Sequence, residues 1–161
     1  MKSQLFAVQC MIYLYRKMIL LLVSIFFHLP NCFADEVFLS LKKDKVNVRY
    51  GPSLESPIKY VYKKINLPIK QIDKNENFRR IIDVKNNSGW IHVSQLKKIN
   101  SIIPLKDKIL FQKPSNFSKP LAKIQKGRVL VIKKCQDNWC KIKTDKFKGW
   151  IKTDNIWGLI K

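Results

Sequence analysis

Two cysteines, Cys135 and Cys140, are the residues whose type and spacing most clearly allow a covalent bond. Four residues, QDNW, lie between them, and a turn in this segment would place the cysteines on facing antiparallel strands. Opposed residues on such strands lie about 4.5–5.5 Å apart at Cα, which suits a disulfide. A redox-active pair would favour the Cys-x-x-Cys spacing, and a metal site would need a nearby histidine or further cysteines. The spacing therefore favours a structural disulfide that clamps one hairpin.

Other side chains offer little catalytic chemistry. His92 is the one histidine after residue 34, and no serine, cysteine or aspartate stands at a spacing typical of a nucleophile with its base. Asp145 and Asp154 fall in turns, where carboxylates usually cap backbone groups. We therefore predict a protein that is not an enzyme and that needs no cofactor or metal. A hydrolase is the competing class, and it would depend on His92.

Aromatic and basic side chains supply the chemistry of a binding surface. Trp90 and Trp150 each follow a glycine, and their indoles either stack on a ligand or pack with the N–H satisfied at the rim of the fold. Strand alternation places Lys141 and Lys143 on one face with Trp139. That face either binds an anionic polymer or is a solvated face that discourages edge-to-edge aggregation. The candidate ligand-binding residues are Tyr50, Tyr60, Trp90, Trp139, Lys141, Lys143 and Trp150.

The N-terminal segment has the layout of a secretory signal peptide. Arg16 and Lys17 precede an apolar run from Met18 to Leu29, which is shorter than the roughly 20 residues that a transmembrane helix needs. Small residues precede the expected cleavage after Ala34. We therefore expect residues 1–34 to be a signal peptide and the mature chain to be exported, either to the periplasm or outside the cell. An uncleaved N-terminal anchor is one alternative. A lipoprotein attached at Cys32 is another, which Asn31 disfavours because a small residue is expected before the cysteine.

The charge of the chain is strongly positive. The full sequence carries a net charge of +21, and removal of Lys2, Arg16 and Lys17 with the leader would leave +18. Such a charge favours anionic partners. AT-rich codon usage would produce it too, since only five of the 32 basic residues are arginine and the chain is also rich in asparagine and isoleucine. Lysine is a poorer bidentate reader of phosphate than arginine, and export makes nucleic acid an unsuitable partner.

Short strands separated by polar turns predict an all-β fold. Gly89-Trp90 and Gly149-Trp150 lie 60 residues apart, and Pro52-Ser53 and Pro114-Ser115 lie 62 apart. Two landmarks with nearly the same offset indicate a tandem duplication. We expect two small β-barrels in tandem, the first at residues 36–97 and the second at 108–161, joined by a linker at 98–107.

Several of these stretches resemble a known family. The segments NVRYGPS (47–53) and GWIHVSQL (89–96) resemble a bacterial SH3 (SH3b) domain. In the second half, CQDNWCKI (135–142) and KFKGWIKTDNIWG (146–158) resemble an exported SH3-like family long catalogued as a domain of unknown function. The resemblance implies five-stranded SH3-like barrels, a binding role and frequent association with the cell wall. The second copy departs from the pattern, because Lys108–Phe111 replaces the asparagine and arginine of the opening strand.

These features together predict a non-enzymatic, exported binding module of the bacterial cell envelope. The expected partner is peptidoglycan or another anionic glycan of the wall, with no integral membrane span in the mature chain. The alternative is a protein–protein adaptor that docks on an envelope enzyme or assembly factor. Duplication would allow two weak sites to act together through effective concentration.

Overall fold

The computed structural model describes residues 15–19, 37–144 and 146–158. Most of the predicted signal peptide, residues 1–34, lies outside the described residues, and residues 15–19 are helical. No described helix has the length and apolarity that a membrane span requires. Residues 36–161 form one compact unit.

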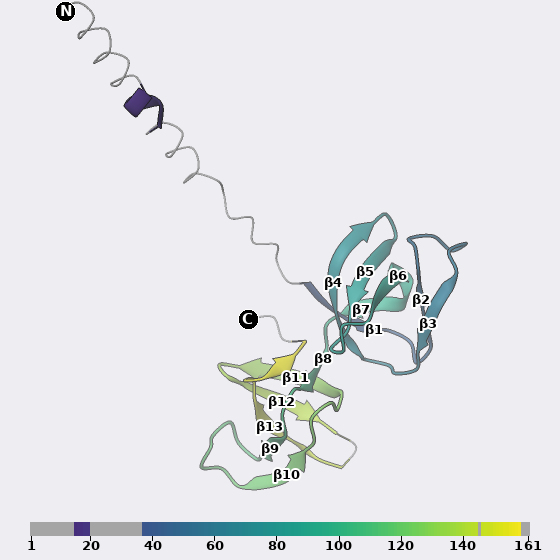
Figure 1. The fold of residues 1–161 in the computed structure, drawn as a ribbon. Helices are drawn as coiled ribbons and strands as arrows, with labels where there is room; N and C mark the ends of the chain where they lie inside the picture. Colours follow the sequence, from purple (N-terminus) through teal and green to yellow (C-terminus); the bar gives the residue numbers. More distant parts are fainter. Residues whose placement is uncertain (1–14, 20–36, 145, 159–161) are drawn as a thin grey trace, which may run out of the picture. The chain divides into compact units, whose positions relative to one another are not determined.

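Two seven-stranded antiparallel sheets follow one another along this unit (Figure 1). The first domain contains β1 (Val37–Leu41), β2 (Val46–Arg49), β3 (Ile58–Tyr62), β4 (Pro68–Asn75), β5 (Phe78–Ile82), β6 (Ser88–His92), the 3₁₀ turn η1 (Val93–Gln95) and β7 (Leu96–Lys98). The second domain contains β8 (Ser101–Pro104), β9 (Lys108–Phe111), β10 (Pro120–Ile124), β11 (Leu130–Gln136), β12 (Trp139–Lys143), β13 (Lys148–Lys152) and β14 (Ile156–Trp157).

The two sheets have the same strand order. The first runs β3-β2-β6-β5-β4-β1-β7 and the second β10-β9-β13-β12-β11-β8-β14. Irregularities repeat as well: the β2–β3 and β9–β10 ladders shift register at Lys59 and Leu121, and the β4–β5 and β11–β12 ladders shift at Ile72 and Lys133. Because bulges increase local twist and bend a strand, their repetition shows that both copies curve in the same way. The predicted all-β fold of two tandem units is confirmed. Each sheet has seven strands rather than the expected five, and the pairing among the described strands does not close either sheet into a barrel.

The Gly-Trp pairs occupy the points where two strands approach most closely. A Cβ atom on Gly89 would lie 3.0 Å from the carbonyl oxygen of Arg49, and one on Gly149 would lie 2.6 Å from that of Phe111. Only glycine lets β6 approach β2, and β13 approach β9, at this distance. Alternation then turns each following tryptophan to the opposite face of the sheet.

Each domain has its own apolar core. Six residues fully excluded from solvent form the first core: Leu41, Val46, Val48, Ile69, Ile81 and Ile91. The second is formed by Ile102, Leu110, Ile124, Leu130, Ile142 and Ile151. Isoleucine and valine dominate both sets because β-branched side chains fit a pleated, half-buried surface.

The segment expected to link the domains, residues 98–107, contains β8. All four residues of β8 are buried, and the strand pairs with β11 and β14 of the second domain.

Side chains from both domains also meet. The Trp157 indole N–H donates to the Pro68 carbonyl oxygen at 3.0 Å, and its ring packs edge-on against Phe38 with centroids 5.1 Å apart. The buried hydroxyls of Ser40 and Ser101 are hydrogen-bonded at 2.9 Å.

Candidate functional site

The outer side of the second sheet, opposite its core, carries a continuous set of aromatic and basic residues. Cross-strand pairing places Lys134 opposite Lys141, Lys141 opposite Trp150, and Trp150 opposite Phe111. Trp139 and Lys152 form the neighbouring pair on the same face. We call this set the basic aromatic face: Phe111, Lys134, Trp139, Lys141, Trp150 and Lys152.

Trp150 is the centre of this face. The Lys134 and Lys141 ammonium groups lie 5.4 and 5.6 Å from its ring centroid, within the range of cation–π attraction. Trp150 is only 6% exposed, although strand alternation turns its side chain away from the core cluster that contains Ile151. The arrangement holds two positive charges over one aromatic surface, where their mutual repulsion is relieved by an anion.

A second aromatic pair extends the face. The rings of Phe111 and Trp139 meet edge-on with centroids 5.6 Å apart. The Lys152 ammonium lies 5.8 Å from the Trp139 ring centroid. Aromatic rings with charged groups at their margins can stack on a sugar ring or an apolar side chain while the cations attract acidic groups.

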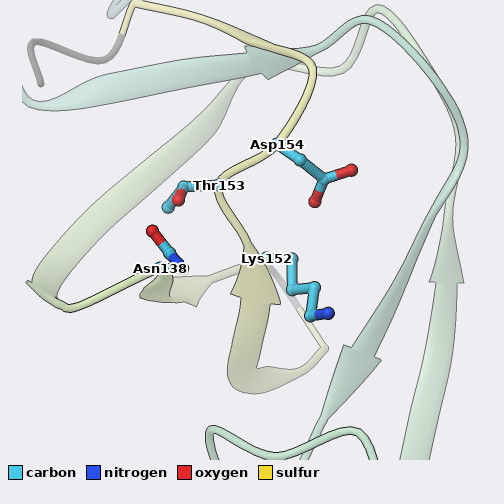
Figure 2. Close-up of a pocket in the computed structure, with 4 residues that line it drawn as sticks. All are labelled: Asn138, Lys152, Thr153 and Asp154. Atoms are coloured by element: carbon cyan, nitrogen blue, oxygen red, sulfur yellow. The ribbon is translucent and has the colours of Figure 1, made fainter.

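A shallow pocket of about 350 Å³ lies where β13 ends, lined by Asn138, Lys152, Thr153 and Asp154. Figure 2 shows the side chains of Asn138 and Thr153 together on one side of the chain, and those of Lys152 and Asp154 on the other. The backbone N–H of Thr153 donates to the Asn138 carbonyl oxygen at 3.0 Å and ties the pocket to the β11–β12 turn. Lys152 therefore belongs both to the pocket and to the basic aromatic face.

An ion pair supports the wall of this pocket. The Lys108 ammonium, on a residue only 9% exposed, lies 2.8 Å from the Asp154 carboxylate and also donates to the Asp154 carbonyl oxygen. The hydrogen bond from Lys108 lowers the pKa of Asp154 below its usual value, against a smaller opposing effect of burial. The carboxylate is therefore charged at neutral pH and holds Lys108 in place.

The equivalent face of the first domain has different chemistry. Trp90 is paired with Arg49 on one side and Arg80 on the other. Phe78 packs edge-on against His92 with centroids 5.1 Å apart. The Arg49 guanidinium donates to the Ser56 carbonyl oxygen at 2.6 Å, so part of its hydrogen-bonding capacity is spent within the fold.

The tyrosines of the first domain lie in different surroundings. Tyr60 packs against the first core, and its hydroxyl is 3.4 Å from that of Tyr62. Tyr62 donates to Asp83 at 3.0 Å, and burial raises the pKa of Tyr62 well above its usual value, reinforced by Tyr60 and Asp83. Tyr50 is exposed, with the Lys59 ammonium 5.6 Å from its ring centroid.

The disulfide between Cys135 and Cys140 is present. The two residues are directly opposed in the β11–β12 ladder, with Cα atoms 4.1 Å apart. Asp137 takes a left-handed conformation (φ 48°) in the turn between them. The clamp fixes the end of the hairpin from which Trp139 and Lys141 project.

Of the candidate residues chosen from the sequence, Trp139, Lys141 and Trp150 meet on one face. Lys143 is exposed on the same side of β12. Tyr50, Tyr60 and Trp90 belong to the first domain. Sequence reasoning did not select Phe111, Lys134 and Lys152, because their proximity to the tryptophans depends on strand register rather than on spacing along the chain.

A comparison with protein families agrees with this fold. The model of the bacterial SH3 domain matches residues 42–98 and 107–158. The chain belongs to the bacterial SH3 domain family. Domains of this family are generally binding modules and often bind cell-wall components. The residues matched fall in both domains, leave out β1 and β8, and include both Gly-Trp pairs.

Similar solved structures give weaker likenesses. NlpC2 from Trichomonas vaginalis is 14% identical with a TM-score of 0.35, over 76% of this chain and 48% of that one. NlpC1 from the same organism is 13% identical with a TM-score of 0.34, over 78% of this chain and 47% of that one. The chain thus spans about half the length of each structure. Among curated proteins, none matches it.

Proposed function

We propose that this protein is a non-enzymatic, exported binding module of the bacterial cell envelope that contacts peptidoglycan or another anionic wall polymer. The observation that carries the proposal is the basic aromatic face, where Lys134 and Lys141 lie over Trp150 and Lys152 lies over Trp139. A polymer that alternates sugar rings with acidic groups matches both components of this face.

Export is supported by two further observations. The Cys135–Cys140 disulfide is of a kind that persists in oxidising compartments. The leader-like segment before Asp35 predicts secretion.

In the described residues no group of three or more histidine, cysteine or acidic side chains is placed to hold a metal ion.

The test is co-sedimentation of residues 36–161, the compact unit that holds both cores, with insoluble peptidoglycan at low and physiological salt. Replacing both Lys134 and Lys141 with Gln removes the charges over Trp150 and keeps much of the covering side-chain volume. We expect wild-type binding to survive physiological salt and the double variant to bind at least several-fold more weakly.

The matched control removes two exposed charges elsewhere. Lys63→Gln with Lys64→Gln changes the net charge equally but lies outside the face. Equal losses in both double variants would mean that binding follows net charge alone. Protein left in the supernatant at physiological salt would reject wall binding and favour a protein partner.

A further inference from the structure

The loop between β9 and β10 spans residues 112–119 (Figure 1), and it presents a phenylalanine entirely to solvent. Phe117 is 100% exposed. An aromatic side chain of this size normally buries most of its surface, either in a core or against a partner. Its full exposure leaves the whole ring free to pack against a partner.

The loop is tightly held rather than extended. The Gln112 N–H donates to the Lys119 carbonyl oxygen at 3.0 Å and closes the base of the loop. The Ser118 N–H donates to the Ser115 carbonyl oxygen at 3.2 Å. The Lys113 N–H donates to the Ser118 hydroxyl at 2.9 Å, and the Phe117 N–H to the Ser115 hydroxyl at 3.2 Å. These bonds fix the backbone at the tip, so little ordering remains to be done on binding.

Groups suited to an anion surround the phenylalanine. A hollow of about 320 Å³ in the loop is lined by Gln112, Lys113, Ser115, Phe117, Ser118 and Lys119. The two serine hydroxyls accept hydrogen bonds from the loop, which leaves each O–H proton available to donate. The lysines add two positive charges, and residues 112–119 contain no acid.

We propose that this loop binds the surface of an anionic lipid bilayer. Phe117 enters the boundary between headgroups and acyl chains, while Lys113 and Lys119 contact lipid phosphates. Aromatic side chains flanked by basic ones are typical of segments that lie in this interface. The negative potential of an anionic membrane attracts each nearby lysine.

The matching loop of the first domain lacks this combination. Residues 50–57 expose Tyr50 at 65% and Leu54 at 61%, but they include the acidic Glu55 and no lysine or arginine. Hydrogen bonding from Ser53 lowers the pKa of Glu55, so this carboxylate stays charged. An anionic surface would repel the first loop and attract the second, and the choice of a lipid surface rests on this charge complementarity.

The loop directly follows Phe111, but its lining contains no residue of the basic aromatic face, and the proposal does not depend on wall binding. A single phenylalanine with two lysines gives weak and reversible attachment that salt weakens. Such a contact would hold the protein near a membrane while leaving the basic aromatic face to its own ligand.

The test is flotation of residues 36–161 with vesicles made of about one part phosphatidylglycerol to two parts phosphatidylcholine, and with vesicles of phosphatidylcholine alone. We expect binding to the anionic vesicles, and about a tenfold loss on Phe117→Ser because the buried aromatic surface is removed. Phe117→Leu should retain most of the binding. Lys113→Gln with Lys119→Gln should lower it and reduce its dependence on salt.

Two controls lie in the first domain: Leu54→Ser removes an exposed apolar side chain, and Lys63→Gln with Lys64→Gln removes two charges. Neither should change flotation as the loop variants do. The proposal is overturned if Phe117→Ser binds vesicles as well as wild type, if the controls lose as much, or if wild type does not float. The last result would direct attention to a protein pocket for Phe117.

Discussion

At the hairpin between the central strands, the first domain opposes Lys74 to Arg79, whereas the second opposes Cys135 to Cys140. Both hairpins turn through a left-handed residue 61 positions apart, Glu76 (φ 41°) and Asp137 (φ 48°). Their backbones are therefore alike, and only the second is covalently closed. Like charges directly opposed on neighbouring strands are unfavourable, so the disulfide replaces the weaker pair.

The outer faces of the two sheets also differ, in the residues that surround the tryptophan of each Gly-Trp pair. Trp90 lies between two arginines, and Arg49 is partly engaged by the backbone of its own domain. Trp150 lies beneath two lysines and beside Phe111. One strand framework thus carries a tryptophan between two arginines in the first domain and a tryptophan covered by two lysines in the second.

The largest expected effect comes from matching substitutions in the two apolar cores, which test whether the two domains are equivalent. Ile91 and Ile151 are both fully buried and lie 60 residues apart in β6 and β13. Replacing either with Ala should lower the free energy of unfolding by about 2–5 kcal/mol, through lost burial and a new cavity. Urea unfolding followed by tryptophan fluorescence measures the change.

The same experiment shows whether the domains unfold together. The contacts of Trp157 with Pro68 and Phe38 predict a single transition that either substitution shifts. Two transitions, of which each substitution moves only one, would show that the domains are energetically independent.

Removing the disulfide has the next largest expected effect. Cys135→Ala with Cys140→Ala should destabilise the protein by up to about 2 kcal/mol, because a short loop loses little entropy on closure. Hydrogen exchange should accelerate in β11 and β12 and stay unchanged in β4 and β5.

The reciprocal change tests whether the first hairpin accepts the same clamp. Lys74→Cys with Arg79→Cys places two thiols at the matching register and removes two opposed positive charges. We expect a disulfide to form and the first hairpin to gain protection from exchange. If the thiols stay unpaired under oxidising conditions, the backbones of the two hairpins differ more than their matched register implies.

The start of the second strand of each domain gives an intermediate effect. Val46 belongs to the first core, and the matching residue 62 positions later is Lys108. Asp154→Asn should destabilise the protein by about 1 kcal/mol, less than a fully buried pair would lose because the Asp154 side chain is 58% exposed.

Lys108→Val makes the second domain resemble the first at this position. We expect it to be neutral or to stabilise the protein by about 1 kcal/mol, because a buried ion pair is often no better than apolar packing. Thermal unfolding of the two variants gives the comparison. Strong destabilisation by Lys108→Val would mean that the ion pair is essential for the shape of the second domain.

Much of the fold can be predicted from the sequence, because the sequence patterns that indicate it are local. The Gly-Trp pairs and the Pro-Ser turns gave the repeat, and alternation gave the strand faces. The pairing of Cys135 with Cys140 also followed from short spacing. The structure supplies the physical reason for the glycines, which is the close approach of a neighbouring carbonyl oxygen.

The remaining features depend on contacts between residues distant in sequence. β1 and β8 lack a clear turn at their boundaries, and each is fixed by partners on both sides. The placement of Lys134 over Trp150 depends on a register shift near Lys133. No spacing in the sequence encodes that shift, so the centre of the candidate face could be predicted only in part.

The smallest expected effect is on the pH dependence of stability. It distinguishes the two domains because each keeps a carboxylate charged in a different way. Burial alone would raise the pKa of Asp83, but hydrogen bonds from Asn87, the Lys85 N–H and Tyr62 lower it overall. The pKa of Asp154 is lowered mainly by the hydrogen bond from the Lys108 side chain. Each group therefore stabilises the fold above its unfolded pKa, near pH 4, and this contribution is lost as pH falls through the lower folded pKa.

Salt should distinguish the two contributions. The Asp154–Lys108 pair is partly exposed and charged at both ends, so added salt should weaken it by about 0.5 kcal/mol. The bonds to Asp83 come from neutral groups and should persist. Unfolding measured against pH at low and high salt should show a salt-dependent part that disappears in Asp154→Asn and remains in Asn87→Ala. The reverse pattern would mean that the first domain, rather than the second, relies on the screened interaction.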